Sequence, residues 1–259
     1  MTRAIRIVQR NAVVYRHIWR GSLFSSFLQP TLYLLALGVG VGSLIDPRRA
    51  AAIPGGGGYL QFLAPGLLAA ACMQVASFES SWPVIGKILW ARNYYAMLAT
   101  PLAVDDLIVG ELLWIAIRLT TVGTAFVLVA FAFGAMHLTP ATPVALFLAV
   151  LTGLTFSAPI VAYAATLKSG ENFNVLFRLI LSPLFMFSGV FFPIDRLPFP
   201  VQWIAKASPL YHGVQLVRAL TLDDQLDAAV ALIHVAYLVV LLTAGFVAAR
   251  YTFRRKLHA

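Results

Sequence analysis

The chain has 259 residues, of which 60% are hydrophobic and only 11% are charged. A soluble protein carries about 25% charged residues because its surface faces water, so the composition excludes an ordinary soluble enzyme. Lysine and arginine number 19 against 10 acidic residues, which leaves a net charge of +9. In so apolar a chain this excess indicates basic loops at an anionic membrane face, whereas nucleic-acid binding would need a soluble basic domain. The single cysteine, Cys72, excludes an internal disulfide.

Six segments are apolar over the roughly 20 residues that a helix needs to cross a bilayer. They predict an all-α, polytopic membrane protein with one transmembrane domain over residues 1–259. The predicted spans are Phe24–Ile45, Tyr59–Ser80, Leu107–Gly134, Pro143–Leu167, Val175–Phe192 and Ala228–Ala249. The loops between them are too short for a soluble catalytic domain. The first outer loop, with Asp46-Pro47 and Gly55–Gly58, is expected to be a flexible connection.

The distribution of lysine and arginine predicts the orientation. Thirteen of these residues fall on the side of the two termini, and five fall on the other side. Because cytoplasmic loops carry the basic excess, both termini are predicted to be cytoplasmic, with the protein in the inner membrane of a bacterium.

The first 20 residues follow the pattern of an amphipathic helix. One polar sector of about 140° collects the arginines. They are Arg3, Arg6, Arg10, Arg16 and Arg20. Apolar residues fill the opposite side, and only Asn11 and Val13 are out of place. The pattern predicts an interfacial helix over residues 2–20, with its arginines facing anionic lipids. The alternative is a basic anchor that simply follows the positive-inside rule.

The inner loop over residues 82–106 is too apolar and aromatic to be dissolved in water, yet Pro83, Gly86 and Pro101 prevent a span. A short helix around 92–98, stopped ahead of Pro101, is predicted. It would expose a hydrophobic patch on the cytoplasmic face, which is typical of a partner surface. The patch consists of Tyr94, Tyr95, Met97 and Leu98. The alternative is an interfacial helix that dips into lipid.

The outer segment over residues 193–222 predicts two short apolar helices below spanning length. The second begins with Ser208 as N-cap and Pro209 at the first helical position, and runs through about Leu220. Two such helices indicate a re-entrant hairpin or a lid on the outer leaflet.

Four ionisable residues lie within or at the ends of the spans: Glu79, Glu111, Arg118 and Arg178. Such groups are costly in lipid and are candidates for function. One hypothesis is a cationic, inward-facing entrance for anionic or phosphorylated head groups. The alternative is structural pairing of Glu79 or Glu111 with Arg118 or Arg178. Glu111 and Arg118 are seven residues apart, so both project from one face of the third span.

Other side chains in the spans favour packing over chemistry. His234 is predicted to be a hydrogen-bonded packing residue rather than a proton relay. Four aromatic residues could stack on sugars, but packing is favoured: Tyr33, Trp114, Tyr163 and Phe185.

Catalytic motifs are missing from the sequence. There is no Walker A motif, since Gly86-Lys87 is followed by Ile88, and there is neither a zincin motif nor a nucleophile elbow. These absences favour a transport subunit over a membrane enzyme, although an outer-face site built from Asp195, His212 and Asp223 stays open.

Two stretches resemble the ABC-2-type exporter permeases. The inner stretch Tyr95–Glu111, YAMLATPLAVDDLIVGE, is similar to the coupling-helix region of that family. The outer stretch Phe187–Pro198, FSGVFFPIDRLP, with Ser208–His212 and Leu216–Leu220, resembles its C-terminal signature. The nearest likeness is to the nodulation-factor (lipo-chitooligosaccharide) export permeases, while drug, O-antigen and teichoic-acid permeases are more distant. The resemblance covers most of the chain and rests on the order of features.

The resemblance implies a half-transporter that homodimerises and binds two copies of a separate ABC ATPase. That ATPase would hold ATP and Mg, and this chain would hold no cofactor. An amphiphile such as a lipo-oligosaccharide, glycolipid or lipid-linked polysaccharide would pass outward between the protomers. The alternatives are a multidrug or antibiotic exporter and an ion-coupled secondary carrier, which would need acidic residues near mid-membrane and an inverted repeat.

The resemblance also implies roles for residues. The ATPase-coupling helix would comprise Arg92, Asn93, Tyr94, Tyr95, Met97 and Leu98. The outer gate would include Phe192, Pro193, Trp203, Pro209, Tyr211 and His212.

Overall fold

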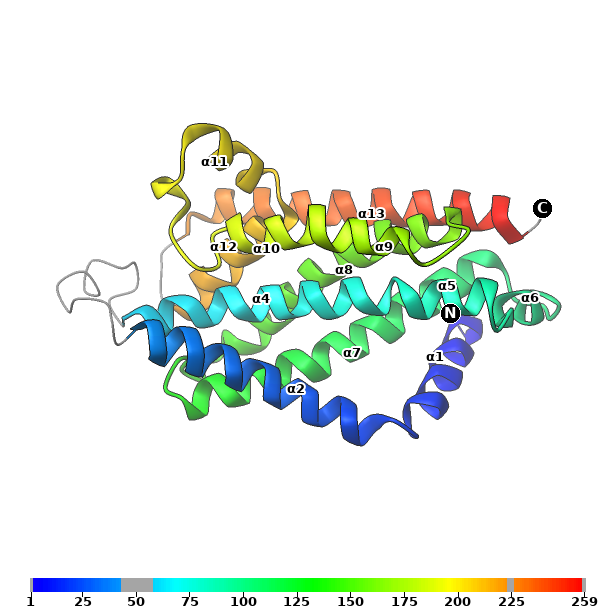
Figure 1. The fold of residues 1–259 in the computed structure, drawn as a ribbon, viewed down its shortest axis with the longest axis horizontal. Helices are drawn as coiled ribbons and strands as arrows, with labels where there is room; N and C mark the ends of the chain where they lie inside the picture. Colours follow the sequence, from blue (N-terminus) through cyan, green and yellow to red (C-terminus); the bar gives the residue numbers. More distant parts are fainter. Residues whose placement is uncertain (1, 43–57, 223–225, 258–259) are drawn as a thin grey trace.

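The computed structural model describes residues 2–42, 58–222 and 226–257, and every regular element in these ranges is helical. Figure 1 shows long helices lying side by side along one axis. The all-α prediction is therefore confirmed. The predicted end of the first span at Ile45, Asp46-Pro47 and Gly55–Gly57 lie outside the described residues.

The elements follow one another in a simple order. They are α1 (Thr2–Tyr15), α2 (Trp19–Tyr33), the π-helix η1 (Leu34–Val41), α4 (Tyr59–Glu79), α5 (Trp82–Leu89), α6 (Asn93–Leu98), α7 (Val104–Ala132), α8 (Thr142–Thr166), α9 (Asn172–Val175), the π-helix η3 (Leu176–Leu181), α10 (Ser182–Phe187), the 3₁₀ turn η4 (Ile194–Arg196), α11 (Phe199–Lys206), α12 (Pro209–Thr221) and α13 (Ala228–Leu257).

Among the described residues, five helical runs are long and apolar enough to cross a membrane. They are Trp19–Gly40, Tyr59–Leu89, Val104–Ala132, Thr142–Thr166 and Ala228–Leu257. They match five of the predicted spans. The other prediction, Val175–Phe192, falls on the shorter apolar run Asn172–Phe187, which ends before Phe192. The helix stops there because Gly189 takes a left-handed φ of +81°, which turns the chain toward Pro193.

Helix α8 is the centre of the bundle, with α4, α7, α12 and α13 packed around it. Small residues make these contacts close. A Cβ added to Gly245 of α13 would lie 2.6 Å from Cδ of Pro159 in α8, and one added to Gly153 would lie 2.6 Å from Leu119 Cδ1 in α7. Lipid tails are as apolar as the helices, so close packing rather than water exclusion holds such helices together.

Helices α11 and α12, the two short helices predicted for residues 193–222, have different environments. Helix α12 packs between α4, α8 and α13, so it enters the bundle, whereas α11 exposes Phe199 and Trp203. The predicted cap of α12 is confirmed, because the Leu210 N–H donates to Ser208 Oγ at 3.2 Å. Helix α12 is therefore the buried member of this pair and α11 the exposed one, while the choice between a re-entrant hairpin and an outer-leaflet lid stays a prediction.

Helix α1 crosses the bundle axis at the end that also carries α5, α6 and both ends of the chain (Figure 1). It packs on α7, where Ala4 and Ile7 press against Gly110. The prediction of one helix over residues 2–20 was wrong at its C-terminal end. Because α1 runs across the axis and α2 runs along it, the chain turns at Arg16–Ile18, and Arg20 belongs to α2.

The packing of α12 can be tested at Gly213, where an added Cβ would lie 2.1 Å from Thr152 Oγ1 in α8. We expect Gly213→Ala to lower the stability of the protein in detergent by about 1–3 kcal/mol, because the overpacked helices must separate. Gly21→Ala in α2 is the control, since a Cβ there meets nothing within 4 Å. Thermal unfolding of both variants measures the difference, and equal midpoints would contradict the close contact.

Candidate functional site

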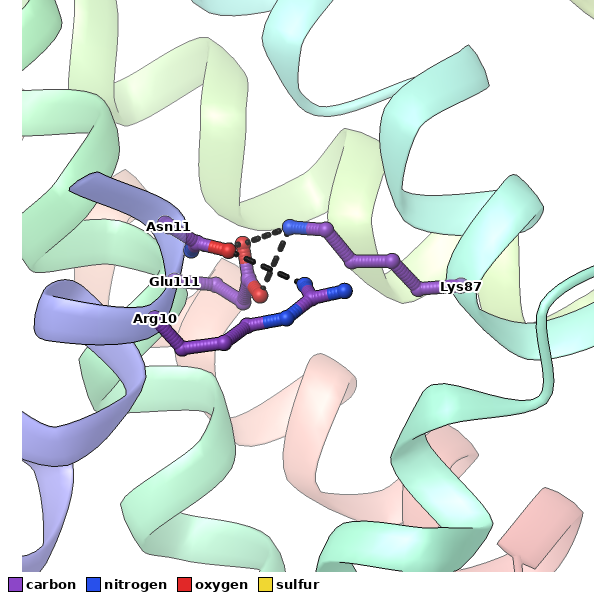
Figure 2. A network of polar contacts seen from close by, with 4 residues as sticks. All are labelled: Arg10, Asn11, Lys87 and Glu111. Atoms are coloured by element: carbon purple, nitrogen blue, oxygen red, sulfur yellow. Dashed lines mark hydrogen bonds and ion pairs between the residues drawn. The ribbon is translucent and has the colours of Figure 1, made fainter. Parts of the chain in front are cut away.

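Glu111 of α7 is the centre of a polar network at the end of the bundle that carries α1, α5 and both chain termini (Figure 2). Its side chain is only 2% exposed. Lys87 Nζ of α5 donates to both carboxylate oxygens, at 2.8 and 2.7 Å, and Asn11 Nδ2 of α1 donates to Oε2 at 3.3 Å. Arg10 Nη1 donates in turn to Asn11 Oδ1 at 3.2 Å. One buried carboxylate thus ties together α1, α5 and α7.

The network explains the residue that did not fit the helical wheel. Asn11 lies on the buried side of α1 because its amide serves Glu111, while Val13 is exposed. The carboxylate pairs with Lys87, so the alternative that paired Glu111 with Arg118 or Arg178 was wrong for this residue.

The predicted short helix is confirmed as α6, but its exposed face differs from the prediction. Tyr94 is fully buried, with its ring 5.9 Å from the Phe253 ring of α13 and the Lys87 ammonium 5.9 Å from its centroid. Burial and then the negative charge of Glu111 raise the pKa of Tyr94 well above its ordinary value. Met97 and Leu98 follow by three and four residues, share the inner side and are half-buried.

The outer side of α6 therefore presents a smaller surface than predicted. Tyr95 is 41% exposed, and Arg92, in the left-handed region at φ 49°, is exposed just before the helix, with half-buried Asn93 between them. The expectation that Tyr94 would face a partner was wrong, because a six-residue helix packed on α5 and α13 must bury one side.

The C-terminal end of α13 is paired with the first turn of α7. Arg250 Nε lies 2.9 Å from Asp105 Oδ1, and Arg254 Nη2 lies 3.5 Å from Asp105 Oδ2. Asp105 and Asp106 occupy the first turn of α7, and the Ala103 N–H donates to Asp106 Oδ2 at 3.2 Å. Carboxylates suit this position because they face the positive end of the helix dipole.

Arg118 and Glu79 form the second buried ion pair. Arg118 Nε donates to Glu79 Oε1 at 3.1 Å, and its Nη1 donates to Tyr15 Oη at 2.7 Å. The guanidinium also lies 4.4 Å from the centroid of the Tyr15 ring. This pairing of Glu79 with Arg118 was one of the predicted alternatives. Arg178 is exposed on η3, away from both carboxylates, and none of the ion pairs among the described residues includes it.

A cleft of about 560 Å³ opens beside this pair, between α2, α4 and the η3–α10 run. Its polar walls are formed by Gln29, Gln74, Glu79, Arg118 and Ser182, and its apolar walls include Phe78, Phe177, Leu181 and Phe185. Gln29 Nε2 donates to Gln74 Oε1 at 2.9 Å. Polar groups thus line a cleft whose other walls are aromatic and aliphatic.

At the end of the bundle opposite α5 and α6, two histidines join α12 to α13. His212 and His234 share a hydrogen bond of 2.6 Å between their Nδ1 atoms, and His212 Nε2 donates to the Lys206 carbonyl at 3.0 Å. With Nε2 protonated, neutral His212 accepts at Nδ1 from His234. The prediction that His234 is a hydrogen-bonded packing residue is confirmed. Tyr237 stacks on His212, with ring centroids 3.9 Å apart.

The other predicted gate residues are spread along the same segment. Phe192, Pro193, Pro209 and Tyr211 are half-buried, whereas Trp203 is 63% exposed on α11 beside Phe199. Only Tyr211 joins the histidine cluster, with its ring 5.4 Å from that of His212. The open alternative of an enzyme site gains no support, since His212 is already bonded, Asp195 is exposed and Asp223 lies outside the described residues.

Arg218 of α12 is a buried charge that the sequence did not single out. Its Nη2 donates to the carbonyls of Gly189 at 3.1 Å and Phe62 at 3.3 Å, and the guanidinium lies 3.9 Å from the Phe62 ring centroid. Lys87, Tyr15 and the Gln29–Gln74 pair were missed in the same way. Their partners lie 24 to 103 residues away in the chain, and the pattern of residue types along the sequence does not reveal pairs so far apart.

The features of this bundle can now be compared with known proteins. The family model described as "ABC-2 type transporter" matches residues 3–222, which is most of the chain. The chain belongs to the ABC-2 type transporter family. It is 30% identical over 256 residues to Nodulation protein J of Rhizobium leguminosarum bv. viciae, covering 98% of this chain and 94% of that protein. It is 32% identical to Nodulation protein J of Rhizobium leguminosarum bv. trifolii, covering 84% and 80%.

Inner membrane transport permease YadH of Escherichia coli (strain K12) is 25% identical over 204 residues, covering 79% of this chain and 77% of that protein. As an ABC-2 permease, the chain is the transmembrane subunit of an ABC exporter in the bacterial inner membrane. Membership of the family implies an ATP-binding-cassette ATPase as its partner.

The Arg118–Glu79 pair gives a direct test of which charges hold the fold. We expect Arg118→Leu to lower stability by about 1–3 kcal/mol, because Glu79 and the Tyr15 hydroxyl lose a partner in a largely buried place. Arg178→Leu removes the same side chain from an exposed site and should change stability by less than about 0.5 kcal/mol. Thermal unfolding in detergent measures both. Adding Glu79→Gln to Arg118→Leu should restore part of the loss, and no restoration would contradict the pairing.

Proposed function

We propose that this permease acts as a homodimer with two ABC ATPase subunits and moves an amphiphilic, lipid-linked substrate outward. ATP and Mg are bound by the ATPase chains. The observation that carries the proposal is the cleft between α2, α4 and α10, which joins polar side chains to apolar walls. A lipo-oligosaccharide, glycolipid or polysaccharide-lipid combines the same two chemistries, a polar head group and an acyl tail. Both termini, α5 and α6 face the cytoplasm in this proposal, because that end carries the basic excess.

The cleft supports selection by hydrogen bonding more than by net charge. Arg118 is paired with Glu79, so this wall carries a balanced charge. The Gln29 and Gln74 amides together offer donors and acceptors beyond the one bond that they share. We therefore expect the head group to be polar and to be oriented, rather than attracted, by Arg118. A second protomer placed against the α2–α10 side would close the cleft into a path between the two chains.

Helix α6 is the proposed coupling helix. Tyr95 and Arg92 point away from the bundle, while the buried ring of Tyr94 locks the helix to α5 and α13. A rigid support is what a coupling element needs, because a loose helix would absorb the movement of the ATPase. At the opposite end, α12 and its histidine contact to α13 form the proposed outer gate.

The alternative of an ion-coupled secondary carrier has little support. Such a carrier uses acidic residues near mid-membrane, and the two carboxylates nearest the membrane, Glu79 and Glu111, are paired near the cytoplasmic end. A multidrug exporter would share the ATPase contact and differ in its substrate. Transport assays that compare a lipid-linked oligosaccharide with an apolar drug cation separate these two.

Coupling can be tested at Tyr95. We expect Tyr95→Asp to reduce co-purification of the ATPase at least about tenfold, because it replaces the exposed aromatic ring proposed to contact the ATPase with a negative charge. Tyr95→Phe should keep the complex. Lys168→Asp introduces an aspartate at an exposed loop residue, outside α6 but at the same end of the bundle, and is the matched control. If Tyr95→Asp leaves the complex intact, α6 is not the coupling helix.

The cleft can be tested at Gln74. Gln74→Leu should lower ATP-driven export of a lipid-linked oligosaccharide in proteoliposomes by about 3- to 10-fold, since one or two hydrogen bonds to the head group are lost. Binding of the ATPase should be unchanged. Gln61→Leu, the same change on the same helix but outside the cleft, is the control. Equal export by both variants would exclude the cleft as the substrate path.

A further inference from the structure

A second cavity, of about 730 Å³, lies between α1 and α6 at the cytoplasmic end. We call it the basic groove. Arg3, Arg6 and Arg10 line it from α1, and Asn93, Met97 and Pro101 face them. Its lining residues include three guanidinium groups and no carboxylate. The nearest buried carboxylate, Glu111, is already neutralised by Lys87. The groove therefore has an uncompensated positive charge.

The arginines are held in place by a few bonds that leave further donors available. Arg3 Nη1 donates to the Pro101 carbonyl at 2.6 Å, which ties α1 to the end of α6. Arg10 Nη1 donates to Asn11 Oδ1, and with the Asn93 amide oxygen turned toward it, Arg10 Nη2 donates to that oxygen at 2.6 Å. Each guanidinium has five N–H donors. Arg3 and Arg10 are thus preorganised, and Arg6 is exposed between them.

The groove also has an apolar side. Ile7 forms its floor and is 1% exposed, while Met97 and Leu102 are half-buried in its wall. Elsewhere on α1, Ile5, Val13 and Val14 are exposed, as in a helix that lies in the bilayer interface. A groove at that depth would lie beside lipid head groups, and its apolar wall would lie beside the glycerol and first acyl carbons.

We infer that the basic groove binds the head group of an anionic phospholipid from the inner leaflet. Arginine pairs with phosphate through two parallel N–H donors, so Arg3, Arg6 and Arg10 suit one phosphodiester. The apolar floor favours a lipid over an acidic protein segment, which would bring no acyl chain to cover it. The inference rests on the placement of α1 at the inner membrane surface, and it is independent of the cargo and of the direction of transport.

Such a lipid would act on the coupling element. It would bridge α1 and α6, which the Arg3–Pro101 bond already joins, and would stabilise α6 before the ATPase binds. Anionic lipid would then raise the coupled activity of the complex without contacting either nucleotide or substrate.

The test uses purified full-length permease in detergent, without ATPase and without cargo, so that its outcome is separate from that of the transport proposal. Native mass spectrometry measures retention of phosphatidylglycerol and of phosphatidylcholine with the same acyl chains. We expect wild type to retain phosphatidylglycerol, and Arg3→Gln/Arg6→Gln/Arg10→Gln to bind it roughly 100-fold more weakly, at about fivefold for each basic residue removed.

Two further variants control for a general loss of positive charge and for a loss of the fold. Arg16→Gln/Arg20→Gln removes two exposed arginines outside the groove and should bind the lipid as wild type does. Arg6→Gln alone leaves the Arg3 and Arg10 contacts in place, so it keeps the fold and should weaken binding about fivefold. Equal retention of the two lipids, or equal loss in the Arg16/Arg20 control, would overturn the inference. So would a triple variant that retains phosphatidylglycerol as well as wild type does, since the three arginines would then not bind the lipid.

Discussion

Burial of charge at the end of the bundle that carries both chain termini is the constraint on which the rest of the structure depends. A carboxylate removed from water costs several kcal/mol unless it is paired and hydrogen-bonded. Glu111 meets that cost with Lys87 and Asn11, which belong to two other helices. Helices α1, α5 and α7 each contribute one side chain to this cluster: Asn11, Lys87 and Glu111. Because these side chains must lie within hydrogen-bonding distance, the need to pair the buried carboxylate fixes the relative positions of the three helices.

That arrangement decides which side of α6 is exposed. With Lys87 drawn to Glu111, the ring of Tyr94 packs between α5 and α13, and α6 has only one side left for a partner. The same α13 reaches the opposite end of the bundle, where His234 and Tyr237 contact His212 and Ala207. One continuous helix of 30 residues thus touches both the proposed coupling helix and the proposed gate. Packed contact of this kind is the physical basis for passing movement across a membrane.

The opposite end of the bundle meets the same problem with backbone groups. A carbonyl that is buried away from water is tolerated only where protein donates to it. Arg218 of α12 donates to two such carbonyls in neighbouring segments, at Phe62 in α4 and at Gly189 after α10. Close contact of Gly213 with Thr152 lets α12 fit beside α8. The buried arginine therefore joins α12 to the segments around it.

Composition and periodicity by themselves determined the membrane class, the positions of five long spans, the short helix ahead of Pro101 and the Ser208 cap of α12. These depend on neighbours within a few residues, where hydropathy and capping act. Tertiary structure alone decided that Tyr94 is buried, that Lys87 is the partner of Glu111, and that Gln29 meets Gln74. It also decided that α1 ends at Tyr15. Each of these depends on which helix faces which, and helix neighbours in a bilayer are chosen by close packing and pairing of groups far apart in the chain.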